Sequence, residues 1–595
     1  MSDRDLVVLG ISGVQRYIAE SRGTADLANA SAIMTMLAAA GASYVHGLPD
    51  VQLVLPHTDA LTVGNDETRP VPNRIVARVP AGEGVDAAKG AEVAIRETWK
   101  THLALVATKT LGYVNVDDFV ADTPGLPDVR WVVVPADQQY EKQWREAGRA
   151  FGALKRSAPF PQIGGRTGGS GRLCDLSRRW LAVEPPKTPK HSRGKLSVAN
   201  WAKRVGLDEK GEERLRFPST RSVASAHYRK RLIELVESDE GVREHLTRLH
   251  QAVRDIDCSL ERPVGGMPEK KGLLADWISR GSAAWLSRDD WDAATVKRRH
   301  PLDDTTDGEK KRDQAVTRGA DAIRELRARL GKQYPGLGRP PVYLAIVAQD
   351  IDSLGERLSA HATPQEHSAL SQSLSELAGK FRDDLETADL LATVVYAGGD
   401  DLLFLVPAKS ALAAAKVART SVDALTGPGQ GLTASTAIVF FHEATPFSGV
   451  VQEAQRLLEQ AKKARVSKDA LGVAFRWHSG ATREVILPWR ASTDAWATDI
   501  LGRFADGPAR IVSPSFMADI DRDADELLAL WKHHEESFQL EVARLADRHA
   551  TGDPTAVKAL VEAVAVLNRE LEDGSSPIPL TDALKIAFAI SREVR

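Results

Sequence analysis

The sequence is poor in cysteine, carries no large excess of charge of either sign, and lacks long hydrophobic runs. Two cysteines among 595 residues exclude a disulfide framework and a zinc site built from four cysteines of this chain. Lys and Arg number 78 against 81 Asp and Glu, which argues against a generally basic nucleic-acid coat. No apolar run reaches the roughly 18 residues of a membrane span, and the charged start Met1-Ser-Asp-Arg-Asp5 predicts no signal peptide. We therefore expect a cytoplasmic protein.

The length predicts several domains, because a single core rarely grows beyond about 100–200 residues. Strand-like and helical runs alternate over residues 1–135, which predicts a first α/β layer domain. Residues 136–340 predict a mostly helical middle domain with loop insertions. Residues 341–485 predict a second α/β domain, and residues 486–595 a C-terminal helical bundle. The expected fold class is α+β multidomain.

The second α/β domain shows the clearest order of elements. Its predicted strands are Val342–Val347, Leu391–Tyr396, Leu402–Val406 and Thr433–Phe441, and its predicted helices span 364–387, 411–425 and 447–465. This order is the βαββαβ unit of ferredoxin-like domains.

Carboxylates stand at two turns of this predicted unit. Asp350 and Asp352 follow the first strand, and Gly398-Gly399-Asp400-Asp401 forms the hairpin turn. The glycines let backbone approach a ligand closely. Because the first strand lies beside the hairpin, we expect Asp350 and Asp400 to converge at one edge of the sheet. Clustered carboxylates suit two Mg²⁺ or Mn²⁺ ions.

A lysine pair lies on the helix after the fourth strand, where a cation would neutralise triphosphate charge. Lys462 is the candidate, although a simply solvated lysine explains the sequence equally well. An isolated Gly-Gly-Asp-Asp is usually only a turn, but flanking strands and the upstream Asp-x-Asp favour a nucleotidyltransferase metal site. Two interpretations of Asp401 stay open, as a metal ligand or as a residue that orients the turn.

A short segment of the first domain is similar in sequence to a segment of the second. Residues Leu9–Ile18 align with Gln349–Leu358, so that Gly10 falls at the position of Asp350 and Ser12 at that of Asp352. No Gly-Gly-Asp-Asp follows, which suggests a duplicated domain without the carboxylates. A chance match over ten positions is the alternative.

The motifs together resemble one known family. Tyr343 to Asp352, Gly398 to Asp401 and Thr433 to Val439 resemble the catalytic Palm domain of the large subunit of type III CRISPR effector complexes. The segments Ile11 to Ser31 and Pro72-Asn73-Arg74 resemble the first Palm domain of the Cmr-type (III-B) version. The resemblance implies two nucleotidyl-cyclase-type Palm domains, a mostly helical domain between them and a C-terminal helical bundle.

The resemblance also implies an activity, the conversion of ATP to cyclic oligoadenylates by 3′–5′ linkage when the complex binds target RNA through its guide RNA. The implied metal ligands are Asp350, Asp400 and the Ile351 carbonyl, with Asp401 assisting catalysis. The implied nucleotide-binding residues are Gly398, Gly399, Asp352, Ser353, Ser435 and Lys462. The implied partners are the other subunits of the complex, and one ATP is expected on each Palm domain.

The sequence departs from the family in two respects. Many members begin with an HD nuclease domain, whereas none of the 15 histidines here is followed by aspartate, so no nuclease activity of that kind is expected. Many members also carry a zinc module, but only Cys174 and an isolated Cys258 are present, so we expect no zinc. Cys174 is predicted to be a small buried residue.

Two alternatives remain at this stage. The first is a stand-alone nucleotide cyclase or cyclic dinucleotide synthase that works without RNA or partner subunits. The second is a catalytically silent scaffold of the ribonucleoprotein complex. The pair Asp350 and Asp400 argues against the scaffold, but carboxylates alone do not demonstrate turnover.

Overall fold

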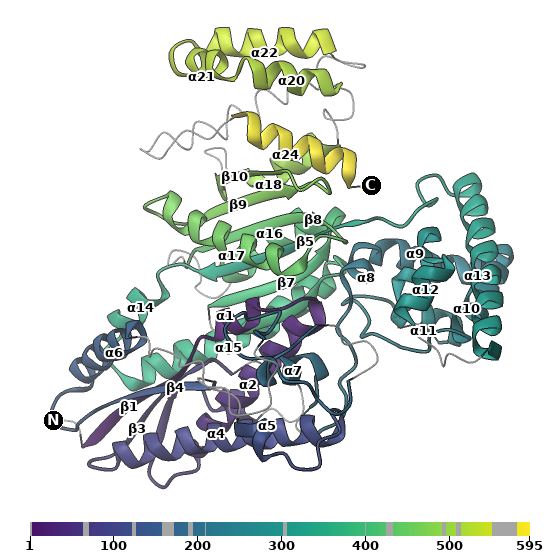
Figure 1. Cartoon of the computed structure of the whole chain (residues 1–595). Coiled ribbons are helices and arrows are strands. Elements are labelled where there is room, and N and C mark those ends of the chain that lie inside the picture. Colours follow the sequence, from purple (N-terminus) through teal and green to yellow (C-terminus); the bar gives the residue numbers. More distant parts are fainter. Residues whose placement is uncertain are drawn as a thin grey trace.

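The computed structural model describes residues 3–62, 71–121, 126–157, 172–188, 194–208, 210–269, 271–300, 306–398, 400–423, 432–490, 495–506, 513–549 and 580–594. Two β-sheets form the body of the molecule (Figure 1). A helical lobe projects from one side, and the C-terminal helices lie beyond the second sheet.

The first sheet has four antiparallel strands in the order β2-β3-β1-β4. Its elements follow one another as β1 (Arg4–Ser12), α1 (Val14–Ala19), α2 (Thr24–His46), β2 (Gln52–Leu55), α3 (Asp59–Thr62), β3 (Arg74–Pro80), α4 (Gly84–Lys109), α5 (Asp117–Ala121) and β4 (Asp128–Val134). Its main helices and strands follow a βαββαβ path. Helices α2 and α4 cover one face of the sheet, and α6 (Tyr140–Arg156) covers the other.

The second sheet has six strands in the order β10-β9-β8-β5-β7-β6. Its elements are β5 (Tyr343–Ile351), α14 (Leu354–Ala360), α15 (Pro364–Thr387), β6 (Thr393–Gly398), β7 (Asp401–Pro407), η3 (Ala408–Ser410), α16 (Ala411–Asp423), β8 (Ala434–His442), α17 (Phe447–Ala464), β9 (Ala470–Arg476) and β10 (Thr482–Pro488). The order β6-β7-β5-β8 repeats β2-β3-β1-β4. Strand β9 pairs in parallel with β8, so the sheet is mixed. The sequence pattern did not predict β9 and β10 as strands of this sheet.

The predicted helix over 364–387 has the bounds of α15 in the structure. Its start is specified locally, because Thr363 and Glu366 form a capping box and Pro364 occupies the first turn.

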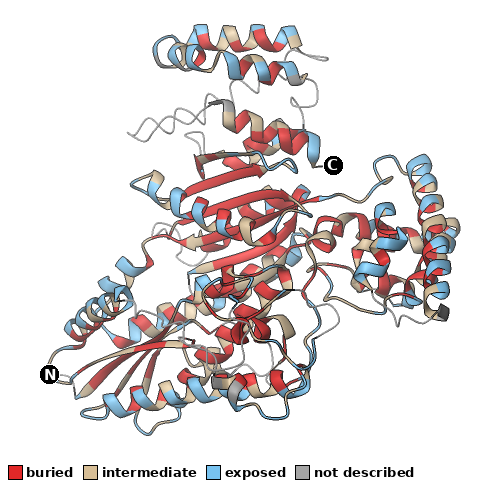
Figure 2. Cartoon of the chain, viewed as in Figure 1, coloured by how far each residue is buried: buried red, intermediate tan, exposed pale blue. Residues whose placement is uncertain are grey.

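Alternate residues of β5 face opposite layers, as strand geometry requires. Ile346 and Ala348 belong to the core that includes α17, whereas Ala345 and Val347 belong to the core that includes α15 and α16. Both faces are therefore covered, and the four inner strands β5, β7, β8 and β9 are buried along most of their length (Figure 2).

The middle of the chain differs from its predicted boundary at one end. Helix α6, predicted as part of the region 136–340, packs on β1 and β4 through Trp144 and Phe151. Its apolar spacing alone could not show which sheet it covers. The first structural unit therefore extends at least to Arg156.

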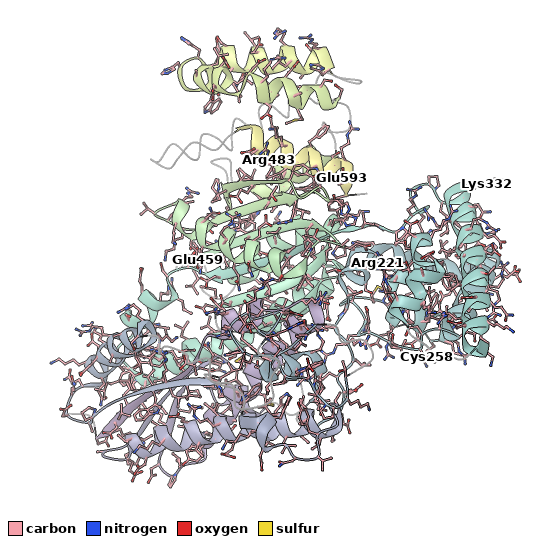
Figure 3. The ribbon with its side chains drawn as sticks, viewed as in Figure 1. Arg221, Cys258, Lys332, Glu459, Arg483 and Glu593 are labelled. Atoms are coloured by element: carbon pink, nitrogen blue, oxygen red, sulfur yellow. The ribbon has the colours of Figure 1, made fainter. Side chains whose placement is uncertain are left out.

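The remainder of the middle region is mostly helical, as predicted. Its helices are α7 (Val198–Val205), α8 (Thr220–Ala224), α9 (Ala226–Ser238), α10 (Glu240–Arg254), α11 (Leu273–Arg280), η1 (Ala283–Leu286), η2 (Arg288–Asp290), α12 (Ala293–Arg299) and α13 (Thr306–Gln333). Helix α7 packs on α2 and α4, while α9 to α13 form the projecting lobe. Arg221 of α8, labelled in Figure 3, pairs with Asp290 of the lobe and Glu443 beyond β8, and so ties the lobe to the second sheet.

The described C-terminal part is helical, with α18 (Ala497–Asp506), α20 (Pro514–Arg522), α21 (Ala524–His533), α22 (Glu535–His549) and α24 (Leu580–Glu593). Helix α24 packs on α18 and on strands β9 and β10, which extends the core of the second sheet. The predicted helical spacing around Leu560 lies outside the described residues. Within the described ranges, no helix is long and apolar enough to span a membrane.

Candidate active site

The predicted carboxylates come together where β5 meets β7. Asp350 lies opposite Asp401 in the strand register, and the Ile351 amide donates a hydrogen bond of 3.0 Å to the carbonyl oxygen of Asp400. Asp401 and Asp350 share a side-chain hydrogen bond. The expected convergence at one sheet edge is therefore present, with β5 held beside the hairpin by backbone pairing.

Lys462 approaches this cluster from α17, because α17 covers the sheet face on which Asp350 lies. Its Nζ is 2.9 Å from Oδ2 of Asp350 and 3.4 Å from Oε1 of Glu459, which Figure 3 labels on the same helix. Burial alone lowers the pKa of Lys462, but the hydrogen bond to Asp350 and its negative charge outweigh burial, and the pKa is raised. The lysine is therefore held as a cation against the carboxylates.

The two acids of the turn, Asp400 and Asp401, both have raised pKa values because desolvation and negative charges close together disfavour their ionised forms. Asp400 retains access to solvent, yet the protein around it and the charge of Asp350 raise its pKa. Burial, followed by the charges of Asp400 and Asp350, raises the pKa of Asp401 to about 8. Desolvated like charges are costly unless a cation balances them. Lys462 supplies only part of that balance.

Asp352 behaves differently from the other acids. Its side chain is buried and accepts hydrogen bonds from Thr433 Oγ1 at 2.9 Å, Ser435 Oγ at 2.8 Å and the Asp469 amide at 2.9 Å. Both carboxylate oxygens are thus occupied by the protein. Asp352 and the Ser435 hydroxyl are hydrogen-bonded to each other, and Asp352 thereby links the end of β5 to β8 and to the loop before β9. Ser435 also lies directly opposite Asp350 in the register of β5 and β8, so this pair borders the carboxylate cluster.

The remaining predicted site residues surround the cluster at different depths. Gly398 ends β6 and lines the cavity described below, whereas Gly399 lies outside the described residues. Ser353 caps α14 with a φ of 55° and accepts a hydrogen bond of 2.9 Å from Lys468 Nζ. The Ile351 side chain is buried on the opposite sheet face. A ligand role for its carbonyl stays a prediction.

A cavity of about 610 Å³ opens in front of Asp400 and Asp401. Its walls come from both sheets. The second sheet contributes Tyr396, Gly398 and the two acids, and the first contributes the segments 11–16 and 71–73 with residues of α2 and α6. Ligand pockets generally fall between about 300 and 1,000 Å³. The carboxylates therefore face a space of nucleotide size between two sheets of the same topology.

The donor set fits hard divalent cations. Among the described residues, no group of three or more His, Cys, Asp and Glu side chains is arranged to hold a metal ion. Mg²⁺ typically uses one or two protein carboxylates and completes its coordination with water and substrate phosphates. Asp350 and Asp400 lie in a cluster of negative charge and could supply these one or two carboxylates. The arrangement fits such a partly open metal site better than a site in which the protein supplies every ligand.

The first sheet has positions equivalent to those of the acids in the second sheet, but other residue types occupy them. Gly10 lies opposite Arg74 at the start of β3, as Asp350 lies opposite Asp401 at the start of β7. The Ile11 amide donates to the Asn73 carbonyl at 3.1 Å, as Ile351 does to that of Asp400. This geometry confirms the predicted alignment of Gly10 with Asp350.

The alignment continues into the following helices. Gly13 caps α1 with a φ of 76°, and Ser353 caps α14 with a φ of 55°. Ser12 thereby takes the position of Asp352.

Two residues at the cavity were not predicted from the sequence. Tyr396 of β6 lies beside the acids, and burial together with the charges of Asp401 and Asp350 raises the pKa of its hydroxyl well above the usual value. Lys155 of α6 lines the opposite wall. No motif marks either residue, although a comparison of α6 with α17 would have singled out Lys155.

Cys174, predicted to be a small buried residue, has no exposed surface, which confirms that prediction. Its Sγ accepts a hydrogen bond of 3.3 Å from the Asn200 amide. Cys258 is exposed on the helical lobe. The expected absence of zinc stays a prediction.

Comparison with known proteins assigns the class. Residues 343–472 match the family model described as Cas10/Cmr2, second palm domain. The second sheet with its helices is therefore a Palm domain. Residues 6–104 match the model described as CRISPR-associated protein Cmr2, N-terminal. Two separate parts of the chain, one in each sheet, thus match Cas10/Cmr2 models.

A curated relative and two solved structures are similar to this chain. The chain is 26% identical over 198 residues to the CRISPR system Cmr subunit Cmr2 of Pyrococcus furiosus, a stretch that covers 28% of this chain and 22% of the relative. A cryo-EM structure of type III-B Cmr-β in the apo state matches with a TM-score of 0.57 and 15% identity, covering 92% of this chain and 78% of the other. A cryo-EM structure of the type III-B Cmr-β bound to cognate target RNA matches with a TM-score of 0.61 and 14% identity, covering 100% and 83%. These two structures support the fold.

Proposed function

We propose that the chain is the large subunit of an RNA-guided antiviral Cmr-type complex and that it converts ATP to cyclic oligoadenylates by 3′–5′ linkage. The observation that carries the proposal is the cluster of Asp350, Asp400 and Asp401: the last two acids line a nucleotide-sized cavity, and Lys462 contacts Asp350. The first sheet serves as a second, non-catalytic Palm that supplies the other wall of the cavity.

The reaction joins two ATP molecules. The 3′-hydroxyl oxygen of the acceptor forms a bond with the α-phosphorus of the donor. The bond from that phosphorus to the bridging oxygen breaks, pyrophosphate leaves with the electron pair, and the hydroxyl proton passes to solvent. When bound, two Mg²⁺ or Mn²⁺ ions would activate the hydroxyl and stabilise the leaving pyrophosphate.

The chain's own residues position these groups. Asp350 and Asp400 would hold the cations, because Asp400 lines the cavity, Asp350 lies opposite its neighbour Asp401, and their charge is only partly balanced. Lys462 orients Asp350 through the 2.9 Å contact and adds positive charge beside the triphosphate. Asp352 holds the loops that shape the site, since its carboxylate accepts hydrogen bonds from two other segments. Little protein acid–base chemistry is needed.

The partners follow from the family. We infer that the other subunits of the complex hold the guide RNA and that binding of target RNA switches on synthesis. The two domain matches and the fold similarity over the whole chain support this inference.

The test uses the complex purified from its native gene cluster, with each NTP separately, Mg²⁺ or Mn²⁺, and matching or non-matching target RNA. Mass spectrometry should detect cyclic adenylates only with ATP and matching RNA. Products that appear without RNA would instead support a stand-alone cyclase. An intact, RNA-bound complex that gives no product with either metal would identify a scaffold.

A further inference from the structure

Helix α6 is the first-sheet counterpart of α17. Each helix directly follows the fourth strand of its βαββαβ unit and packs on the face of the first strand that carries Gly10 or Asp350. Each also ends with two consecutive basic residues in its last turn, Lys155-Arg156 in α6 and Lys462-Lys463 in α17. The duplication therefore places Lys155 at the position of Lys462.

The first sheet keeps this lysine but has no room for a carboxylate beneath it. A Cβ added to Gly10 would lie 2.9 Å from Cζ of Phe151, one turn before Lys155 on α6. The aromatic ring of Phe151 therefore occupies the region that the Asp350 side chain fills in the second sheet. Asn73 replaces Asp400, so this half of the cavity has no acid at either equivalent position.

Lys155 consequently has no carboxylate of its own sheet to pair with at these positions. Its Nζ lies 4.9 Å from the centre of the Phe151 ring, and the residue lines the cavity that contains Asp400. Lys155 and Asp400 influence each other's ionisation across that space. Burial and the charge of Arg74 lower the pKa of Lys155, and the charge of Asp400 acts in the opposite direction. Lys155 is thus a cation that faces the cavity from the wall opposite the metal-type edge.

We propose that Lys155 binds the triphosphate of the acceptor nucleotide, held in the first-sheet half of the cavity without metal ligands, while the donor nucleotide binds at Asp350 and Asp400. The proposal rests on the proposed function. It assigns the two halves opposite means of neutralising phosphate, a lysine in one and carboxylate-held cations with Lys462 in the other. The acceptor supplies only its 3′-hydroxyl, so its own triphosphate is not broken and needs binding but no activation.

Two analogues separate the roles. 3′-Deoxy-ATP lacks the attacking hydroxyl and serves only as donor, whereas α,β-methylene-ATP has an uncleavable bridge and serves only as acceptor. With matching target RNA and Mg²⁺, the complex should join them into one linear dinucleotide, quantified by chromatography. Initial rates are measured while each analogue is varied at a fixed concentration of the other.

The variant Lys155→Ala should raise the KM for α,β-methylene-ATP about tenfold, as expected for losing one charge-assisted phosphate contact. The KM for 3′-deoxy-ATP should stay within about twofold, and Lys155→Arg should restore most of the acceptor affinity. Lys462→Ala should instead raise the KM for 3′-deoxy-ATP and leave the KM for α,β-methylene-ATP within about twofold. Lys142→Ala, an exposed lysine on the same helix, is the matched control.

Distinct outcomes overturn the inference. An unchanged acceptor KM in Lys155→Ala, or a rise confined to the donor, would exclude Lys155 as the acceptor's phosphate ligand. Equal loss for both analogues in Lys155→Ala and Lys155→Arg would indicate a structural role. If the unaltered complex forms no dinucleotide and also makes no product from ATP, the proposed function itself fails, which is a separate result.

Discussion

The two sheets of this protein share a path and a register but differ at one edge. In the second sheet, Asp350 and Asp401 face each other across β5 and β7. In the first sheet the same pair of positions holds Gly10 and Arg74. Both edges border the same cavity, so its two walls have opposite chemical character.

The comparison shows which features of a duplicated unit are tied to the scaffold and which to the chemistry. The scaffold features recur in both sheets: the strand order, the backbone hydrogen bond from Ile11 or Ile351, and the left-handed cap at Gly13 or Ser353. The carboxylates do not recur: in the second sheet they crowd one another and the pKa values of Asp400 and Asp401 are raised. In the first sheet the ring of Phe151 fills the corresponding space.

The largest effect should come from removing an acid of the second sheet. Asp400→Ala should lower cyclic adenylate synthesis about 100- to 1,000-fold or more, because charge stabilisation at the reacting phosphate is lost. The measurement is product formation by the RNA-bound complex. Assembly should be unchanged on size-exclusion chromatography, and Asp383→Ala, an exposed acid on α15, should retain activity. Joint loss of synthesis and assembly would make Asp400 a structural residue.

A smaller loss should follow from removing the cation of the same sheet. Lys462→Ala should lower the rate about 10- to 100-fold, since the lysine orients a carboxylate that is proposed to hold metal. The rate is measured at several Mg²⁺ concentrations, because a weakened metal site should be partly rescued at high Mg²⁺. Lys463→Ala, its exposed neighbour, is the control. Equal losses in both variants would argue against a specific role for Lys462.

Much of this comparison was predictable from the sequence. The βαββαβ order of the second unit followed from alternating strand and helix patterns, and the predicted convergence of Asp350 with the Gly-Gly-Asp-Asp turn is present. The ten-residue similarity between the two domains correctly aligned Gly10 with Asp350. These features are local, so the sequence records them directly.

Other features depend on which segments meet in space. The partners of Asp352 come from β8 and from the loop before β9, and strand periodicity says nothing about such contacts. Asp352 and Ser435 were predicted as nucleotide-binding residues, and only the fold shows their side chains bonded to each other. Lys155 was missed because α6 was assigned to the middle region instead of to the first sheet.

A third prediction tests why the first sheet has glycine at the position of Asp350. Gly10→Ala should destabilise the chain by about 1–3 kcal/mol, because the new Cβ would lie 2.9 Å from Phe151 Cζ and 3.1 Å from the Asn73 carbonyl oxygen. Chemical denaturation of the full-length chain measures the loss. Combining it with Phe151→Leu should recover part of the stability. Gly23→Ala, where a Cβ meets nothing within 4 Å, serves as control. Equal costs at Gly10 and Gly23 would show that Phe151 does not exclude a side chain there.

The smallest effect should be a pH-dependent gain in stability from neutralising one acid of the second sheet. In the metal-free chain, burial and the neighbouring charges raise the pKa of Asp401 to about 8, while an unfolded aspartate ionises near pH 4. The folded state therefore holds this proton more tightly than the unfolded state does. The resulting stability is fully present below about pH 4 and is lost progressively as pH rises to about 8.

Asp401→Asn does not titrate and escapes this loss. Its melting temperature in EDTA should exceed that of the unaltered chain by roughly 2–4 °C near pH 8 and converge with it near pH 4. Addition of Mg²⁺ should narrow the difference at pH 8, because bound cations favour the ionised acids of the unaltered chain. Asp383→Asn should show no such pH trend. A variant that is less stable than the unaltered chain at pH 8 would mean that the Asp401 carboxylate anchors the hairpin, whereas a gain that grows with pH would show that its crowded negative charge destabilises the metal-free fold.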